Sequence, residues 1–170
     1  MPPTEAVIRL ATSADLEAVA AINAHYVAHT VITFEEHPPS VADWHGKLGE
    51  LTARGLPFLV ADLGGEVAGY AYAGPWRPKP AYRHTVEDTI YLAPGHVGRG
   101  LGGRLLSALV AGATAAGLRR MIAVIADAGD ERSIALHRRH GFTEAGRLTE
   151  VGFKLGRWVD TTLMERPLTP

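Results

Sequence analysis

His96-Val97-Gly98-Arg99-Gly100-Leu101-Gly102-Gly103-Arg104 decides how the second half of the chain is organised. This segment follows a β-branched, apolar stretch at 85–92 and precedes a run at 101–116 whose leucines recur at helical spacing. Glycines carry no Cβ, so such a loop can wrap closely around an anion, and the helix after it offers free N–H groups and a positive dipole end. The segment therefore predicts a diphosphate-binding turn between a strand and a helix.

Two other interpretations of this loop remain. Gly98, Gly100 and Gly103 also match the GxGxxG pattern, and Asp127 stands near the spacing of the ribose-binding acid of a dinucleotide domain. Such a domain needs several more βα units, whereas only 67 residues follow Gly103 and residues 93–97 separate the strand from the glycines. We therefore disfavour dinucleotide binding. A plain loop at the start of a helix is the other alternative.

The rest of the sequence predicts a mixed α/β domain. Val7 to Leu10 is typical of a short strand, after which Ser13 is expected to cap a helix. The Gly64-Gly65 turn between two strand-like runs predicts an antiparallel hairpin. Met121 to Ala126 contains no polar residue, which is typical of a strand buried on both faces. Further helices are expected at 41–53, 101–116 and 131–140, and further strands at 58–61, 67–72, 85–92, 142–152 and 158–163.

Composition limits the possible functions. The 170 residues are 46% hydrophobic with a formal net charge of −1, so we expect one domain over residues 1–170 and no bulk binding of nucleic acid. The chain has no cysteine, which excludes disulfides, cysteine metal ligands and a cysteine nucleophile. The sequence contains neither a signal-like start nor an apolar run of membrane-spanning length, so we expect a cytoplasmic protein without membrane contact.

Longer stretches resemble a known family. The Gly98–Gly102 loop, with its preceding strand and with residues 130–142, is similar to the GCN5-related N-acetyltransferase (GNAT) superfamily. Residues 72–77, 85–87, 90–92 and 151–160 more narrowly resemble the phosphinothricin acetyltransferases, a group that includes enzymes acting on methionine sulfoximine. The resemblance covers nearly the whole chain. It implies a GNAT-like α/β fold: a mixed, mostly antiparallel sheet of about six to seven strands, with one parallel β-loop-α-β unit and about four flanking helices. It also implies an acetyl-CoA co-substrate and a homodimer.

Acetyl transfer from a thioester to an amine makes two demands on protons. An α-amine has a pKa of about 8, so much of it arrives protonated and needs a base. Glu87 matches the family's base, and strand alternation should turn Asp88 to the opposite face. His137 stands where many superfamily members have the tyrosine that serves the departing thiolate. The sequence leaves open whether His137 protonates sulfur or assists the base.

The resemblance also implies binding residues. For the cofactor these are Ile90, Tyr91, Leu92, Gly98, Arg99, Gly100, Leu101, Gly102, Gly103, Asp130 and Ser133. Val97 and Asp130 stand where the family usually has Gln or Arg and Asn, respectively. An arginine fork suits a carboxylate or phosphinate. The expected substrate residues are Phe34, Arg77, Pro78, Lys79, Tyr82, Arg83, Thr85 and Glu87. We predict no metal, because the His25–His29 and His137–His140 pairs lack a third ligand.

The sequence thus predicts an enzyme that transfers acetyl from acetyl-CoA to the α-amine of a small amino acid, such as phosphinothricin or methionine sulfoximine, by direct attack. Two alternatives stay open. One is an N-acetyltransferase with a peptide or polyamine acceptor, and the other is a non-catalytic sensor that binds acyl-CoA.

Overall fold

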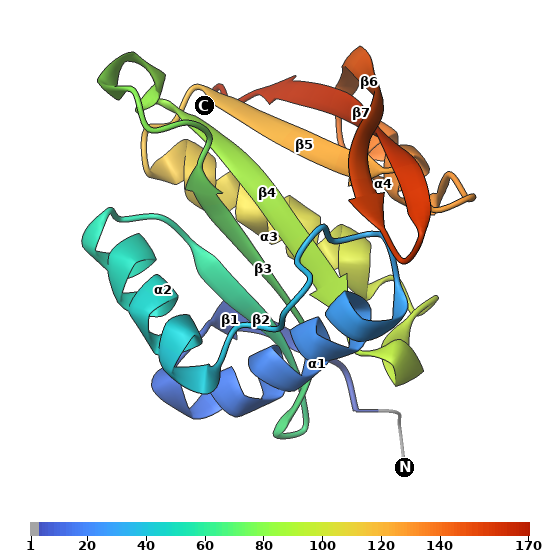
Figure 1. The fold of residues 1–170 in the computed structure, drawn as a ribbon. Coiled ribbons are helices and arrows are strands. Elements are labelled where there is room, and N and C mark those ends of the chain that lie inside the picture. Colours follow the sequence, from blue (N-terminus) through green and yellow to red (C-terminus); the bar gives the residue numbers. More distant parts are fainter. Residues whose placement is uncertain (1–3) are drawn as a thin grey trace.

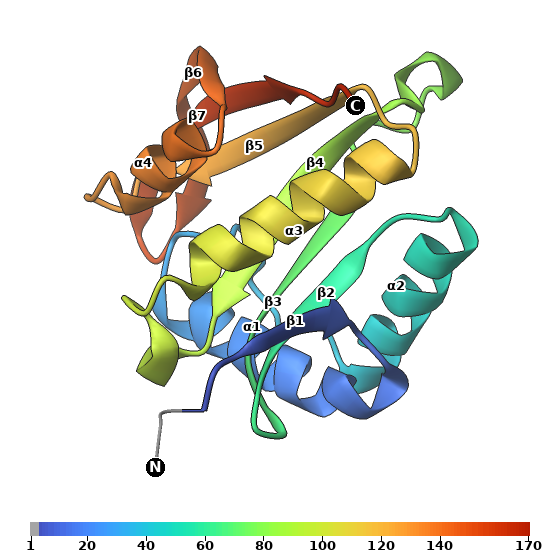
Figure 2. The ribbon, with the colours of Figure 1, turned by 180° about the vertical axis from the view of Figure 1, so that it is seen from behind.

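The computed structural model describes residues 4–170; the first three residues of the expected domain lie outside the described part. Helices are interspersed among the strands along the chain (Figures 1 and 2). They run in the order β1 Val7–Leu10, η1 Ser13–Asp15, α1 Leu16–His29, α2 Val41–Ala53, β2 Phe58–Leu63, β3 Glu66–Pro75, η2 Pro80–Tyr82, β4 Thr85–Leu92, η3 Pro94–His96, α3 Leu101–Ala115, β5 Arg120–Ala126, α4 Arg132–Arg139, β6 Thr143–Lys154 and β7 Arg157–Pro167.

The seven strands form one sheet in the order β1-β2-β3-β4-β5-β7-β6. Every neighbouring pair is antiparallel except β4 and β5, which are parallel and joined through α3. This confirms the expected mixed sheet with one β-loop-α-β unit. The parallel pairing covers only Thr85–Glu87 against Arg120–Ile122. Beyond it the two strands diverge (Figure 1).

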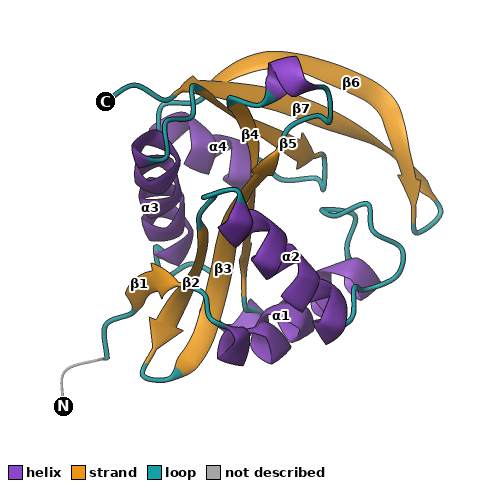
Figure 3. Ribbon diagram, turned by 90° about the vertical axis from the view of Figure 1, so that its left-hand side faces the viewer, coloured by secondary structure: helices purple, strands orange, loops and turns teal. Residues whose placement is uncertain are grey.

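Helices cover both faces of the sheet, because strand residues alternate between two apolar clusters. One cluster joins α3 to one face through leucines such as Leu105, Leu106 and Leu109. The other joins α1 and α2 to the opposite face, where Trp44 contacts the rings of Phe58 and Tyr70. Figure 3 shows α3 and the α1–α2 pair on opposite sides of β2 and β3.

Two local predictions were wrong. The first helix is preceded by the 3-10 turn η1. The N-cap of this turn is Thr12 rather than Ser13, and Thr12 forms a capping box with Asp15. The two residues are neighbours with the same capping chemistry, so the sequence could not separate them. β5 is not buried on both faces, since Val124 is 39% exposed. Its last residues no longer pair with β4, and they line a cavity instead.

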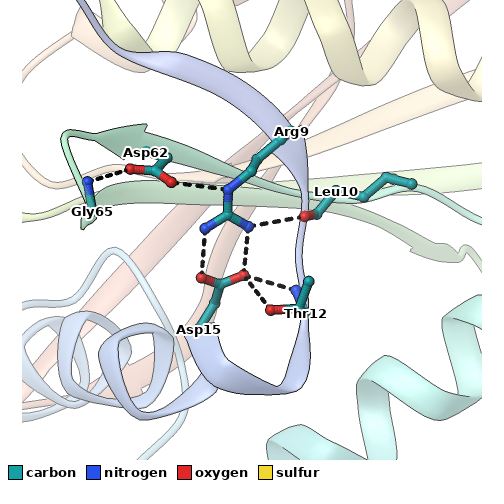
Figure 4. A network of polar contacts seen from close by, with 6 residues as sticks. All are labelled: Arg9, Leu10, Thr12, Asp15, Asp62 and Gly65. Atoms are coloured by element: carbon teal, nitrogen blue, oxygen red, sulfur yellow. Dashed lines mark hydrogen bonds and ion pairs between the residues drawn. The ribbon is translucent and has the colours of Figure 1, made fainter.

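A partly buried ionic cluster fixes the N-terminal strand to the first helix (Figure 4). Both terminal nitrogens of Arg9 on β1 donate to the two carboxylate oxygens of Asp15, each at 2.8 Å. Its Nε donates to Asp62 on β2 at 3.0 Å, and the Asp62 carboxylate also accepts from the Gly65 backbone in the hairpin turn. One guanidinium therefore joins β1, the start of α1 and the β2–β3 turn.

Candidate active site

A cavity of about 980 Å³ lies where β4 and β5 diverge. Its wall includes Asp88 to Leu92 from β4 and Val124 to Ala126 from β5. These β4 residues pair with β3 on one side but not with β5 on the other. The backbone groups that face the gap are therefore available to a ligand, as a fully paired strand would not leave them.

The glycine loop opens α3 at one end of this cavity. Gly98 and Gly100 have φ angles of +83° and +77°, which L side chains rarely adopt, and Gly100 is the N-cap of α3. The first helical bond runs from the Arg104 N–H to the Gly100 carbonyl. The N–H groups of residues 101–103 precede it, so they have no partner within the helix. Backbone donors and a helix dipole fit an anionic diphosphate here.

The start of α4 forms a further part of the cavity wall. The Asp130 carboxylate accepts from the backbone N–H and from the guanidinium of Arg132, at 3.0 and 3.1 Å. An asparagine could donate a hydrogen bond from this place, whereas the carboxylate only accepts. The pKa of Asp130 is lowered, first by the hydrogen bond from the Arg132 side chain. Asp130, Arg132 and Ser133 all line the cavity, as does the exposed Val97 of the glycine loop.

Glu87 reaches the cavity from the face of β4 that carries α1 and α2. The residue across the β3–β4 pair is Gly74, which has no side chain to fill the space beside the carboxylate. Glu87 is half-buried, and its pKa is raised by burial and by the charge of Asp88, while Lys47 of α2 opposes the shift. A raised pKa makes this carboxylate a stronger base.

Asp88 faces the other side of β4, as expected, and there it meets α4. His137 Nε2 donates to Asp88 Oδ2 at 2.8 Å, and His137 Nδ1 donates to the Ser133 carbonyl at 2.7 Å. Because both partners can accept a hydrogen bond, these contacts favour the doubly protonated imidazolium form of the ring. Burial lowers the pKa of His137, but the hydrogen bond and charge of Asp88, with the Ser133 carbonyl, raise it overall. Both residues also line the cavity.

The loop between α1 and α2 covers the cavity and is held by the β6–β7 hairpin. Lys154, near the end of β6, is buried and donates from Nζ to the Thr33 carbonyl at 2.7 Å. The ring of Phe34 lies so close to Gly152 that a Cβ at residue 152 would collide with it. Thr33 and Phe34 both line the cavity, so contacts with β6 hold this part of the cavity wall in place.

Comparisons with known proteins identify the family. The family model described as "Acetyltransferase (GNAT) family" matches residues 19–142. The chain belongs to this family. It is an N-acetyltransferase with acetyl-CoA as co-substrate, as the sequence predicted.

Relatives of this acetyltransferase have similar names. It is 44% identical to a phosphinothricin N-acetyltransferase from Alcaligenes faecalis over 161 residues, which cover 95% of this chain and 82% of the relative. It is 43% identical to an L-methionine sulfoximine/L-methionine sulfone acetyltransferase from Pseudomonas aeruginosa, covering 96% of this chain and 95% of that one. The structure of a phosphinothricin acetyltransferase from Sinorhizobium meliloti with acetyl-CoA matches with a TM-score of 0.92 and 48% identity, covering 96% and 89%.

The structure brings nine of the predicted site residues of this acetyltransferase together in the cavity wall. Those that line the cavity are Phe34, Glu87, Ile90, Tyr91, Leu92, Gly102, Asp130, Ser133 and His137. Leu101 and Gly103 lie in the first turn of α3, and Gly98, Arg99 and Gly100 in the loop before it. A Cβ at Gly103 would lie 3.3 Å from the His140 ring, so this glycine allows α3 and α4 to approach. Their roles in binding stay a prediction.

The loop after β3 lies outside the cavity wall. Arg77 lies over the Trp76 ring, with its Cζ 5.1 Å from the ring centroid, and Arg83 donates to the Pro80 carbonyl. The cavity lining does not include Arg77, Pro78, Lys79, Tyr82, Arg83 or Thr85. The substrate-binding role of these six residues stays a prediction.

Sequence reasoning missed several cavity residues on the α1–α2 side. Tyr26, Trp44, Lys47 and Tyr72 all line the cavity. Lys47 had a detectable signal, because it lies three residues after Trp44 and four before Leu51 in the helix predicted at 41–53. That spacing puts a charge on the apolar face of a helix. Such a residue either extends to solvent or serves a buried site.

Residues 4–170 contain neither a membrane-spanning helix nor a cluster of metal ligands. No helix there is long and apolar enough to cross a bilayer. The same residues contain no group of three histidine or acidic side chains placed to hold a metal ion.

Proposed function

We propose that this acetyltransferase acetylates the α-amine of a small amino acid such as phosphinothricin or methionine sulfoximine. The observation that carries the proposal is the half-buried Glu87 carboxylate, which faces the cavity beside the side-chain-free Gly74. A cavity with a half-buried carboxylate in its wall suits a small charged acceptor. The names of the relatives from Alcaligenes faecalis and Pseudomonas aeruginosa support the same substrate class.

Glu87 acts as the general base in this proposal. It takes a proton from the acceptor ammonium, directly or through water, and the free amine then attacks the acetyl carbon. The new C–N bond forms as the C–S bond breaks, and the thiolate leaves with the sulfur electrons. The absence of cysteine removes a thiolate as acyl-enzyme nucleophile, which supports direct attack. The raised pKa of Glu87 makes the carboxylate a stronger base toward the amine proton.

His137 supplies the proton for the departing thiolate. The Asp88 carboxylate favours the imidazolium form, which carries the proton that the thiolate needs. Asp88 touches neither the acceptor nor sulfur in this mechanism and serves as a positioning residue for His137.

The cofactor lies along the free edge of β4. Backbone groups of Ile90 to Leu92 bind the acetyl and pantetheine parts, and the N–H groups that open α3 bind the diphosphate. Asp130 and Ser133 flank the pantetheine arm from α4.

We also propose that residues 1–170 work as one domain, that two copies form a dimer, and that the protein acts in the cytoplasm without binding nucleic acid. The β6–β7 hairpin exposes Val151, Phe153 and Trp158, which suits a surface covered by a second copy. Light scattering at working concentration should give twice the 18.2 kDa chain mass. A monomer mass would overturn the dimer.

The first experiment measures release of CoA with a thiol-reactive dye, for which a protein without cysteine gives no background. Acetyl-CoA is mixed in parallel with phosphinothricin, methionine sulfoximine, methionine, a lysine peptide or spermidine. Rapid release with the first two supports the proposal. Release only with the peptide or polyamine overturns the acceptor, and cofactor binding without release from any amine supports a sensor instead.

A further inference from the structure

Lys47 places a positive charge inside the cavity from α2. Its side chain is half-buried, and Nζ lies 4.7 Å from the centroid of the Tyr72 ring, in a cation–π contact. This contact holds the ammonium next to the aromatic face of Tyr72. Both Lys47 and Tyr72 line the cavity.

Lys47 lies on the same side of the sheet as Glu87. In the β3–β4 register, Tyr72 is opposite Thr89 and Gly74 is opposite Glu87, so the side chains of Tyr72 and Glu87 project from one face. The missing side chain at Gly74 leaves room between Glu87, the Tyr72 ring and α2. Lys47 acts electrostatically on Glu87, whose pKa it lowers against the stronger effect of burial.

The arginine that lines the cavity is already paired with a carboxylate, as is His137, which contacts Asp88. Lys47 and Arg132 are the lysine and arginine side chains that line it in the described chain. Arg132 is exposed at the start of α4 and forms an ion pair with Asp130 at 3.1 Å. No ion pair is found for Lys47 within residues 4–170. The ammonium of Lys47 therefore remains for a ligand.

We propose that Lys47 binds the α-carboxylate of the acceptor amino acid. A zwitterion would then lie between two opposite charges, with its ammonium at Glu87 and its carboxylate at Lys47. This arrangement turns the α-amine toward the base and discriminates against amines without a neighbouring carboxylate. The inference rests on the proposed function, because it assigns the recognition of that same acceptor.

The test compares methionine sulfoximine with its α-carboxamide, which keeps the amine and side chain but lacks the negative charge. Lys47→Met removes the ammonium at nearly constant length, and Lys47→Arg keeps the charge. Arg54→Met is the matched control, since Arg54 caps the same helix and pairs with Glu50 in solvent. Steady-state CoA release gives kcat and KM for both acceptors, and KM for acetyl-CoA reports on the rest of the site.

We expect Lys47→Met to lower kcat/KM for the acid by about ten- to a hundredfold, mostly through KM, and to change the amide less than about threefold. Lys47→Arg should keep most of the preference for the acid, and Arg54→Met should match the wild type. Equal losses for acid and amide, or no loss for the acid, would overturn the role of Lys47 and leave the proposed function standing. If the wild type acetylates neither compound, the proposed function and this inference both fail.

Discussion

The Asp88–His137 pair provides a stability test whose sign depends on pH. The two side chains are 6% and 5% exposed and meet at 2.8 Å, so the pair is shielded from solvent. In Asp88→Asn the amide oxygen can still accept from the ring, but the charge that compensates the imidazolium is gone. Removing one partner of such a charged hydrogen bond costs about 3 kcal/mol. For a chain of this length, that lowers Tm by about 6–12 °C.

The pH dependence follows from the direction of the pKa shift. The pKa of His137 is raised in the folded protein, so the stabilisation is complete below the unfolded value of about 6.5 and is lost as pH rises through the folded value. In Asp88→Asn, burial remains and lowers the pKa, so this variant loses stability as pH falls below about 6.5. The Tm difference from the wild type should therefore be largest near pH 6 and should shrink toward about pH 9.

Thermal unfolding followed by circular dichroism from about pH 5.5 to 9 measures both quantities. Glu144→Gln is the control, since Glu144 pairs with Arg138 of the same helix at 2.9 Å but more than half exposed. It should change stability by less than about 1 kcal/mol at every pH. An Asp88→Asn protein with wild-type Tm at pH 6, or with a deficit that does not shrink at high pH, would refute the assignment of a buried imidazolium pair.

Three further predictions concern the base, the loop and the N-terminal cluster. Glu87→Gln should lower kcat/KM by about 10²- to 10⁴-fold. In the wild type the rate should fall as pH decreases, because the carboxylate with its raised pKa becomes protonated, and the variant should lose this dependence. A pH–rate profile checks both effects, and acetyl-CoA binding should be unchanged. Gly100→Ala has open space for its Cβ but forces an L residue to φ +77°. Chemical denaturation should therefore show a free energy of unfolding lower by about 1–2 kcal/mol, and the KM for acetyl-CoA should rise. An unchanged KM would contradict a role of the loop in diphosphate binding. Arg9→Met leaves the buried Asp15 without its bidentate partner, and because the Arg9 side chain is one-third exposed the loss should be about 2 kcal/mol. The pKa of Asp15 is lowered chiefly by the Arg9 hydrogen bond, so this contribution is present above about pH 4 and lost as pH falls further; equal acid unfolding of variant and wild type would contradict it.

Most of the fold could be predicted because its determinants are local. The helix at 41–53 has its start signal in Ser40 and its stop signal in Gly55, and both ends agree with α2. The Gly64-Gly65 hairpin and the strand before the glycine loop were equally clear. β5 shows the limit of such reasoning. Val124 is apolar because a cavity wall is apolar, and sequence periodicity cannot distinguish a side chain facing a ligand site from one facing the core.

The site was less predictable, because part of it depends on packing between distant elements. The glycine loop is contiguous in sequence, whereas Lys47 reaches the cavity only because α2 packs across β3, and Lys154 contacts Thr33 across 121 residues. Arg77 and Arg83 have the side-chain chemistry that suits a carboxylate, which is why the sequence predicts them as substrate residues. Their positions after β3 and before β4 put them in a turn beyond the strand ends, outside the cavity lining.

Adjacent carboxylates on β4 illustrate how backbone geometry assigns chemical roles. Glu87 and Asp88 are neighbours in sequence, yet strand alternation sends one toward α2 and the other toward α4. Glu87 meets a half-buried space with one lysine nearby, and its pKa rises toward the range of a useful base. Asp88 meets an imidazole whose protonated form it stabilises. Because β5 pairs with β4 only as far as Glu87, both carboxylates reach the same cavity. One strand can thus place a proton acceptor and a proton donor on two sides of a single reaction space.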